Sequence, residues 1–300
     1  MLDAWRLTSR LVLFAVIFFF SRLAFAGSFN VGSISSSPVG ETKKFWPLAS
    51  YLARQLQAEG IDDGKVVVAD GIPEMSFFLK KKQVDLYIDS FFPSLAVSHL
   101  SGSKLLLRRW KMGIGEYRSV IFTRNDTKIT RLEDLKGKVI AFEEPFASSG
   151  YFFPKIVLLQ KGFHLVQKRP KNHPIKPDKV TYIFSRGDSN TIFLVLSGVA
   201  AAGAIDNQKY DTLAKSLNSF RIIYETLSFP RQIVSVRADL SPAMVTKVKD
   251  ILLNMPLSAE GEKVLRAFEG TTKFDEIPAR TIKLMAELRG YVDEELKTQR

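Results

Sequence analysis

Segments typical of strands and segments typical of helices alternate along most of this 300-residue chain. Residues 29–34, 66–68 and 86–88 are short apolar runs of the kind found in buried strands. Between them, apolar side chains in residues 42–56 recur at the three- and four-residue spacing of a helix. A β-α-β-α-β order predicts a parallel, doubly wound sheet covered by helices, and so the α/β class.

A second set of such segments begins near residue 120. Strands are expected at 120–123 and 139–142, and a helix from Ser148. Thr130 and Glu133 have the spacing of a capping box, which predicts a short helix at that point. The repetition of the pattern predicts two lobes, each built around its own sheet.

After about residue 220 the chain offers two more strands and three helices. We therefore expect residues 27–120 to form the first part of lobe 1 and residues 121–220 to form lobe 2. Residues 221–300 would return to lobe 1 and add the C-terminal helices. Two lobes joined by crossovers predict a hinge and a ligand cleft, because ligands of open α/β sheets bind at the carboxyl ends of strands.

The first 26 residues have the composition of a secretory signal peptide. Arg6 and Arg10 precede an unbroken apolar run at residues 11–20, and a small-x-small motif follows at residues 24–26. This pattern predicts cleavage and a periplasmic protein. Arg22 is unusual so near a cleavage site, which leaves an uncleaved anchor open as the alternative. The chain has no cysteine, which excludes disulfides and a cysteine-linked lipid.

The net charge is +12, and removal of residues 1–26 takes away three Arg and one Asp, leaving 40 minus 30, or +10. Such a balance favours acidic partners, namely an anionic ligand or an anionic membrane surface. The alternative is a basic secreted protein without such a partner. Secretion and the lack of a nucleic-acid-binding motif argue against nucleic acid.

Catalytic patterns are absent from the sequence. The three histidines, His99, His164 and His173, have no metal-ligand spacing. No zinc-protease, nucleophile-elbow or phosphate-loop motif occurs, and general bases and nucleophiles are scarce. We therefore predict a protein that is not an enzyme and has no cofactor and no metal.

Three polar turns follow predicted strands, at residues 35–38, 89–93 and 146–151. The third contains Ser148, Ser149 and Gly150 at a helix start, where free backbone N–H groups and the helix dipole attract anions. An ordinary helix cap is the alternative, since serine is a common capping residue. The first two turns contribute Ser36, Asp89 and Ser90 as candidates from the first lobe.

Tyr117 and Ser119 alternate with Arg118 on the predicted crossover strand, so their side chains share one face. From that position both hydroxyls could donate hydrogen bonds into the cleft. A half-buried strand tyrosine without a ligand role is the alternative.

Several short motifs occur in the order and spacing of a known family. They are Trp46-Pro47-Leu48-Ala49-x-Tyr51-Leu52, Val84-Asp85-Leu86, Tyr117-Arg118-Ser119-Val120, Leu132-x-Asp134-Leu135-Lys136-Gly137-Lys138, Ser148-Ser149-Gly150-Tyr151-x-x-Pro154 and Leu196-Ser197-Gly198. Over nearly its whole mature length the chain resembles the binding proteins of the phosphate, phosphite and phosphonate ABC uptake family. The resemblance implies a type II periplasmic-binding-protein fold. It also implies that Ser148 and Ser149 hold phosphonate oxygens, with Tyr117 and Ser119 lining the same cleft.

The chain departs from the family pattern in three places. Ala147 stands at the first hydroxyl position of the turn, Asp188-Ser189-Asn190 replaces a typical His-Asp pair, and Asp89 stands where many relatives carry Gly. Because an unpaired carboxylate beside a dianion is costly, these acids point to a zwitterion with an amine or to another ligand. Alternatively, Asp89 and Asp188 cap helices and face away. Asp206 completes the candidate set.

The mechanism expected from these features is hinge closure around a small polar ligand, a phosphonate-like anion or a zwitterion. The partner would be the membrane permease of an ABC importer. A membrane sensor kinase that reads the closed form is the alternative. We expect a monomer.

Overall fold

The computed structural model describes residues 27–168 and 176–298. The predicted signal peptide, residues 1–26, and most of the basic loop before residue 180 lie outside the described residues. In the described ranges, no helix combines the length and the apolar character that a membrane span requires.

Lobe 1 is built on a mixed six-stranded sheet. Three strands at one side of the sheet are mutually parallel, and three more pair antiparallel beside them. In spatial order they are β16 (Thr271–Asp275), β6 (Lys104–Lys111), β15 (Gln232–Val236), β5 (Leu86–Asp89), β2 (Val31–Ile34) and β4 (Val66–Ala69). The helices around this sheet are α2 (Pro38–Gln55), α3 (Ile72–Lys80), α4 (Phe91–Ser101), α8 (Pro242–Asn254) and α9 (Ala259–Ala267).

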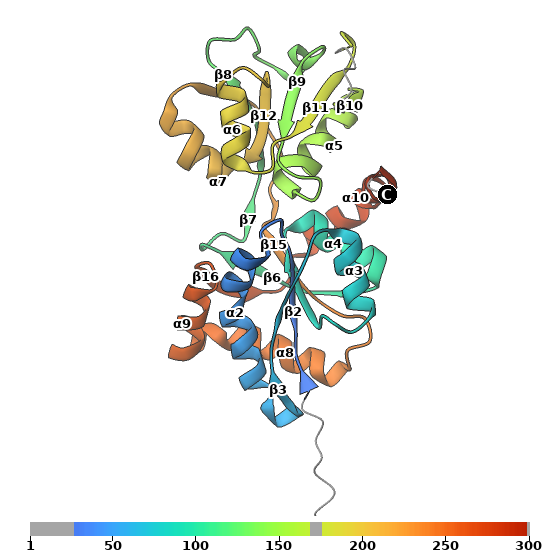
Figure 1. Ribbon diagram of the computed structural model, residues 1–300, viewed down its shortest axis with the longest axis vertical. Helices are drawn as coiled ribbons and strands as arrows, with labels where there is room; N and C mark the ends of the chain where they lie inside the picture. The colour runs from blue at the N-terminus through green and yellow to red at the C-terminus, as the bar shows by residue number, and fades with distance from the viewer. Residues whose placement is uncertain (1–26, 169–175, 299–300) are drawn as a thin grey trace, which may run out of the picture.

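Lobe 2 repeats the plan with a second six-stranded sheet (Figure 1). Four strands are parallel, and the other two form an antiparallel pair at the far side. In order they are β10 (Leu165–Gln167), β11 (Val180–Phe184), β9 (Val139–Phe142), β12 (Ala202–Asp206), β8 (Ser119–Arg124) and β13 (Phe220–Glu225). The helices that cover this sheet include α5 (Phe153–Gln160), α6 (Asp188–Leu196) and the short α7 (Asn207–Lys209).

The α/β class is confirmed, but the expectation of wholly parallel sheets is wrong. In lobe 1, β15 returns from the other lobe and runs antiparallel between β5 and β6. In lobe 2, β8 enters from the hinge and pairs antiparallel with β12. The strands that lead into or out of the crossovers, β6, β8, β13 and β15, all pair antiparallel, so the crossovers break the parallel order.

The predicted capping box is also shifted by one residue. The short 3₁₀ helix Leu132–Leu135 is capped by the carboxylate of Asp134, not Glu133. The Asp134 Oδ2 atom accepts hydrogen bonds from the backbone N–H of Thr130 at 2.9 Å and of Arg131 at 3.2 Å. Thr130 therefore anchors the turn through its backbone N–H and its hydroxyl, which donates to the same Asp134 oxygen at 3.3 Å, and the carboxylate provides the cap.

The two lobes share one apolar cluster. Phe92 of α4 stacks on Phe152 with ring centroids 4.0 Å apart, and Phe153 of α5 stacks on Phe229 at 3.6 Å. These rings belong to a buried cluster that continues through α3, α4 and the hinge. Separation of the lobes would expose this aromatic surface, so the described arrangement is one in which they are held together.

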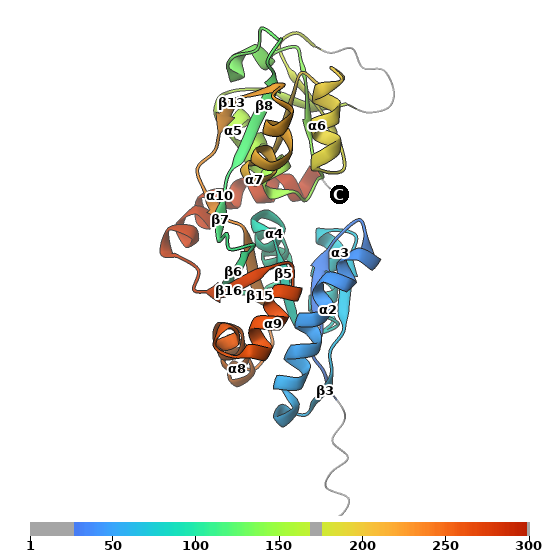
Figure 2. The ribbon, with the colours of Figure 1, turned by 90° about the vertical axis from the view of Figure 1, so that its left-hand side faces the viewer.

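Two crossover segments pair with each other at the hinge. Strand β7 (Glu116–Tyr117) leaves lobe 1, strand β14 (Phe229–Pro230) returns to it, and the two pair antiparallel. The C-terminal helix α10 (Ala279–Thr298) forms a third link and lies across the junction of the lobes (Figure 2).

Helix α10 packs on lobe 1 and ends on lobe 2. Its apolar side joins the cluster that contains α4. Near its end, the buried Glu295 carboxylate accepts hydrogen bonds from the Tyr151 hydroxyl at 2.6 Å and from Lys155 Nζ at 2.5 Å. Helix α10 therefore fixes the two lobes to each other through charge-assisted hydrogen bonds.

Candidate functional site

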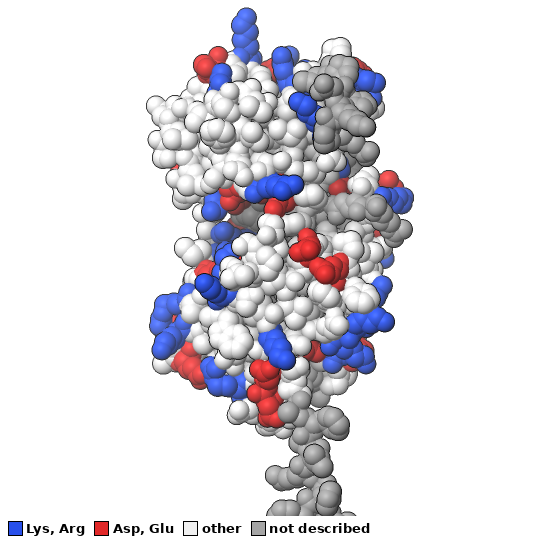
Figure 3. All heavy atoms as spheres, viewed as in Figure 1, with Lys and Arg blue, Asp and Glu red and all other residues white. Residues whose placement is uncertain are grey.

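The edges of the two sheets that carry the carboxyl ends of the parallel strands face each other. Strand β5 ends at Asp89 in lobe 1, and β12 ends at Asp206 in lobe 2. A hydrogen bond across the junction, from Ser36 Oγ to Glu144 Oε1 at 3.1 Å, shows that the turns beyond these edges meet. Figure 3 shows a hollow between the lobes with acidic and basic side chains beside it. The strand ends thus converge where an open α/β sheet binds ligands.

The Ser148–Gly150 turn opens a π-helical turn, Ser148–Phe152, that leads into α5. The Ser148 hydroxyl accepts a hydrogen bond from the backbone N–H of Phe92 at 2.8 Å and donates one to Ser90 Oγ at 2.9 Å. Both partners belong to the start of α4 in lobe 1. The side chain of Ser148 therefore holds the lobes together in this state, as Ser90 does from the other side.

Gly150 gives the turn room for a carboxylate. A Cβ atom built there would lie 1.9 Å from Glu143 Oε2, far inside contact distance. The Glu143 backbone N–H also donates to the Gly150 carbonyl at 3.0 Å. A negative charge consequently lies against the turn, at a position where a helix start favours anions.

Tyr117, Ser119 and Ser149 lie together at the hinge side of this edge. The Tyr117 hydroxyl shares a hydrogen bond with Ser149, and burial together with the Asp206 charge raises the pKa of Tyr117. Ser119 is fully buried, its backbone N–H donates to Thr226 Oγ1 at 2.9 Å, and its Oγ has no partner in the described parts of the chain. Burying a hydroxyl without a partner is unfavourable, which makes Ser119 Oγ a candidate donor to a ligand.

Asp89 lies half-buried at the end of β5. Burial raises the pKa of its carboxyl to about 7, and the charge of Glu41 acts in the same direction. Three donors oppose this shift: the backbone N–H groups of Ser90 (2.6 Å) and Ile34 (3.2 Å), and the Tyr87 hydroxyl (3.1 Å). The carboxyl is therefore balanced between its protonated and ionised forms near neutral pH.

Asp188 and Asp206 form a second acidic pair in lobe 2. Burial, and then the charge of Asp206, raise the pKa of Asp188, while Lys209 opposes the shift with its Nζ 3.6 Å from Asp188 Oδ2. Asp206 accepts from the Lys209 backbone N–H at 2.9 Å and so caps α7. The charge of Asp206 thus acts on Asp188, and a positively charged group beside Asp188 is favoured.

The remaining predicted residues have smaller roles in this state. Asn190 donates from Nδ2 to the Ser185 carbonyl at 3.0 Å and stabilises its own turn, and Ser189 is exposed. Sequence reasoning missed Arg231, whose guanidinium carbon lies 5.6 Å from the Tyr117 ring centre. The sequence around Arg231 contains no recognisable motif. Its place beside Tyr117 becomes apparent only from the pairing of β14 with β7 at the hinge.

Comparison with protein families decides the assignment. Residues 32–281 match the model of the family described as "ABC transporter, phosphonate, periplasmic substrate-binding protein". The chain belongs to this family. The family resemblance inferred from the motifs is thereby confirmed.

Solved structures agree on the fold. XAC2383 from Xanthomonas citri, bound to chloride ion, has a TM-score of 0.84 and 23% identity, covering 90% of this chain and 99% of its own. PhnD1 from Prochlorococcus marinus, in complex with methylphosphonate, has a TM-score of 0.67 and 18% identity, covering 89% and 98%. These likenesses confirm the type II periplasmic-binding-protein fold of this phosphonate-family member.

A curated relative belongs to a different class of protein. The tetrathionate sensor histidine kinase TtrS of Salmonella typhimurium is 23% identical over 265 residues, which are 83% of this chain and 43% of TtrS. The chain therefore spans about two fifths of the length of that relative. Because TtrS is a sensor kinase, the match is the basis for the alternative sensor role of this family member.

Proposed function

We propose that this protein captures a small solute carrying both a phosphonate-like anion and a protonated amine, and delivers it to the permease of an ABC importer. The observation that carries the proposal is Ser119 Oγ, a fully buried hydroxyl at the strand edge without a partner among the described residues. A hydroxyl in that position is explained by a bound acceptor.

Hydroxyl donors support the anionic half of the ligand. Ser119 and Ser149 are buried on neighbouring segments, and Tyr117 joins them through its hydrogen bond to Ser149. Arg231 adds a positive charge beside the tyrosine ring. Such donors bind a phosphonate oxygen with charge-assisted hydrogen bonds, which are stronger than neutral ones.

Carboxylates support the cationic half. Asp89, Asp188 and Asp206 surround the same strand edges, and they would repel a simple dianion. An ammonium group close to Asp89 would lower the pKa of that carboxyl from about 7 and release a proton on binding near neutral pH. The Ser148–Ser90 contact between the lobes would then close the site over the ligand.

Calorimetric titration of residues 27–300 tests both halves. We expect 2-aminoethylphosphonate to bind more tightly than ethylphosphonate, with an affinity that rises from pH 6 to pH 8 as Asp89 ionises. Ser119→Ala should weaken both ligands by about tenfold or more, because a hydrogen bond to a charged group contributes about 1.5–3 kcal/mol. Ser216→Ala on the exposed face of lobe 2 is the matched control and should bind as the wild type does.

Two results would contradict the proposal. Equal affinity for the two phosphonates would show that the site does not recognise the amine. No binding of either phosphonate would show that the ligand is not a phosphonate.

The sensor role rests on the similarity to TtrS. Pull-down from membranes with ligand-loaded protein separates the roles, because recovery of a histidine kinase instead of a permease would favour sensing.

A further inference from the structure

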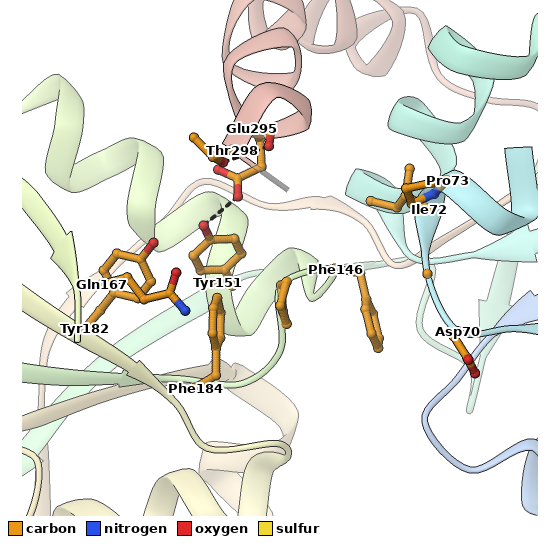
Figure 4. A pocket seen from close by; sticks show the side chains of 12 residues that line it. Asp70, Ile72, Pro73, Phe146, Tyr151, Gln167, Tyr182, Phe184, Glu295 and Thr298 are labelled. Atoms are coloured by element: carbon orange, nitrogen blue, oxygen red, sulfur yellow. Dashed lines mark hydrogen bonds between the residues drawn. The ribbon is translucent and has the colours of Figure 1, made fainter. Parts of the chain in front are cut away.

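A cavity of about 460 Å³ lies between α10, the start of α3 and the aromatic side of lobe 2 (Figure 4). Its volume is within the range of small-molecule sites. The described residues that line it are Asp70, Gly71, Ile72, Pro73, Pro145, Phe146, Tyr151, Gln167, Tyr182, Phe184, Glu295 and Thr298. None of the residues proposed for the phosphonate site lines this cavity.

One wall of the cavity is aromatic. Phe184 lies edge-on to Tyr151, with ring centroids 5.0 Å apart, and to Tyr182 at 5.6 Å. Figure 4 shows these rings together on the lobe 2 side, with Phe146 between them and Ile72 of lobe 1. The faces of aromatic rings carry partial negative charge and attract cations.

The protein itself demonstrates that attraction at this wall. The Lys155 ammonium lies 4.9 Å from the Tyr151 ring centre and 5.9 Å from that of Tyr182. It also donates hydrogen bonds to the Tyr151 hydroxyl at 2.7 Å and to Glu295. Two of the wall's rings therefore already hold a cation from outside the cavity lining.

The two charged side chains among the described lining residues of the cavity are acidic, and Glu295 is paired with Lys155, which lies just outside the lining. The described lining contains Asp70 and Glu295 but neither Lys nor Arg, although the chain has 43 Lys and Arg in total. Asp70 has no ion pair within the described ranges, and its backbone N–H donates to Glu74 Oε2 at 2.7 Å. In a protein with a large positive charge, this lining disfavours an anion and favours a cation.

We propose that this cavity is a second binding site, for an organic cation with an apolar body such as a quaternary or tertiary amine. The aromatic wall binds the cationic head, and the exposed Asp70 at the lobe 1 rim of the cavity attracts it electrostatically. Because lobe 1, lobe 2 and α10 all contribute lining residues, an occupant stabilises the joined lobes. The proposal does not depend on the ligand of the phosphonate site.

Choline and its uncharged analogue 3,3-dimethylbutan-1-ol test the charge requirement by calorimetry on residues 27–300. The two molecules have the same shape, so we expect choline to bind about tenfold more tightly. Equal binding of both would overturn the cation assignment, and binding of neither would overturn the site.

Two pairs of variants test the location. Asp70→Asn should weaken choline binding by about threefold to tenfold. Asp62→Asn, which changes an exposed carboxylate on the short strand β3 (Ile61–Asp63) of lobe 1, should not. Phe184→Leu should weaken choline similarly, whereas Phe193→Leu, an exposed ring on α6, should not. Choline binding that is unchanged in both Asp70→Asn and Phe184→Leu would refute the location.

A third variant separates this site from the phosphonate site. Ser119→Ala should leave choline binding unchanged, and choline should not compete with 2-aminoethylphosphonate. Loss of choline binding in Ser119→Ala, or direct competition, would place the cation in the phosphonate site and overturn the second site. Failure of all phosphonates to bind, with choline behaving as expected, would leave the present proposal standing.

Discussion

Replacing Asp89 by Asn should change the pH dependence of stability in a defined direction. The native carboxyl has a pKa of about 7, whereas the ordinary value is 3.8. Between these values the native state binds more protons than the unfolded state does, so the free energy of unfolding falls as pH rises. The contribution is therefore most favourable in acid and is lost as the carboxyl ionises at neutral pH.

The size of the effect follows from the two values. With 1.36 kcal/mol for each pKa unit, the free energy of unfolding falls by about 2.6 kcal/mol between pH 5 and pH 8 from this group. Water at the half-buried side chain screens part of that difference, so we expect about 2 kcal/mol. Asn cannot titrate, so the stability of Asp89→Asn should not show this decline with pH. Altered hydrogen bonds to Ile34 and Tyr87 would lower its free energy of unfolding by the same amount at every pH.

Urea unfolding of wild type and Asp89→Asn at pH 5, 6, 7 and 8 measures the difference directly. From pH 5 to pH 8, the free energy of unfolding of wild type should fall by about 2 kcal/mol relative to that of Asp89→Asn. Asp62→Asn, at an exposed site, should run parallel to wild type. Parallel curves for Asp89→Asn and wild type would refute the raised pKa and, with it, the expected proton release on amine binding.

Three further outcomes test the contacts between and within the lobes. Phe92→Ala should cost about 3–5 kcal/mol of stability because it removes the ring stacked on Phe152, as urea unfolding would show; a cost below about 1 kcal/mol would contradict the shared cluster. Gly150→Ala should destabilise by about 1–3 kcal/mol, and adding Glu143→Ala should recover most of it, since the clash is with that carboxylate; no recovery would count against it. Glu295→Gln should enlarge the radius of gyration in small-angle scattering, because α10 loses its charged contact with lobe 2, and an unchanged radius would show that the aromatic cluster suffices.

Sequence reasoning found most helices and most of the parallel strands, though not β10, because their apolar spacing is local. It missed β6, where Arg108 and Arg109 interrupt the pattern of a buried strand. Arg109 is fully buried, and its side-chain partners, which include Thr271 Oγ1 at 2.8 Å, lie more than 120 residues away. Neighbouring residues in the sequence give no sign that a charged side chain is buried when its partners are so distant along the chain. For this reason the sequence alone predicts neither β6 nor its partner β16.

The candidate site shows the same limit. The motifs pointed to the Ser148–Gly150 turn and to Asp89, and the structure places both at the facing strand edges. The bonding of Ser148 to the start of α4 and the missing partner of Ser119 depend on how two lobes meet. Such pairings arise from tertiary packing, which a single sequence does not contain. The ligand roles of these residues therefore stay predictions.

The pairing of β7 with β14 has a consequence for how the molecule is assembled in time. Tyr117 and Phe229 are direct partners, so lobe 2 leaves and rejoins the rest of the chain at a single point, as an inserted domain does. Its sheet comes from one continuous stretch and can form as soon as that stretch is available. The sheet of lobe 1 needs β15 between β5 and β6, and it stays divided until the inserted domain has been made and the chain has come back. Joining the paired ends by a short turn should therefore yield lobe 1 as a smaller, uninterrupted protein.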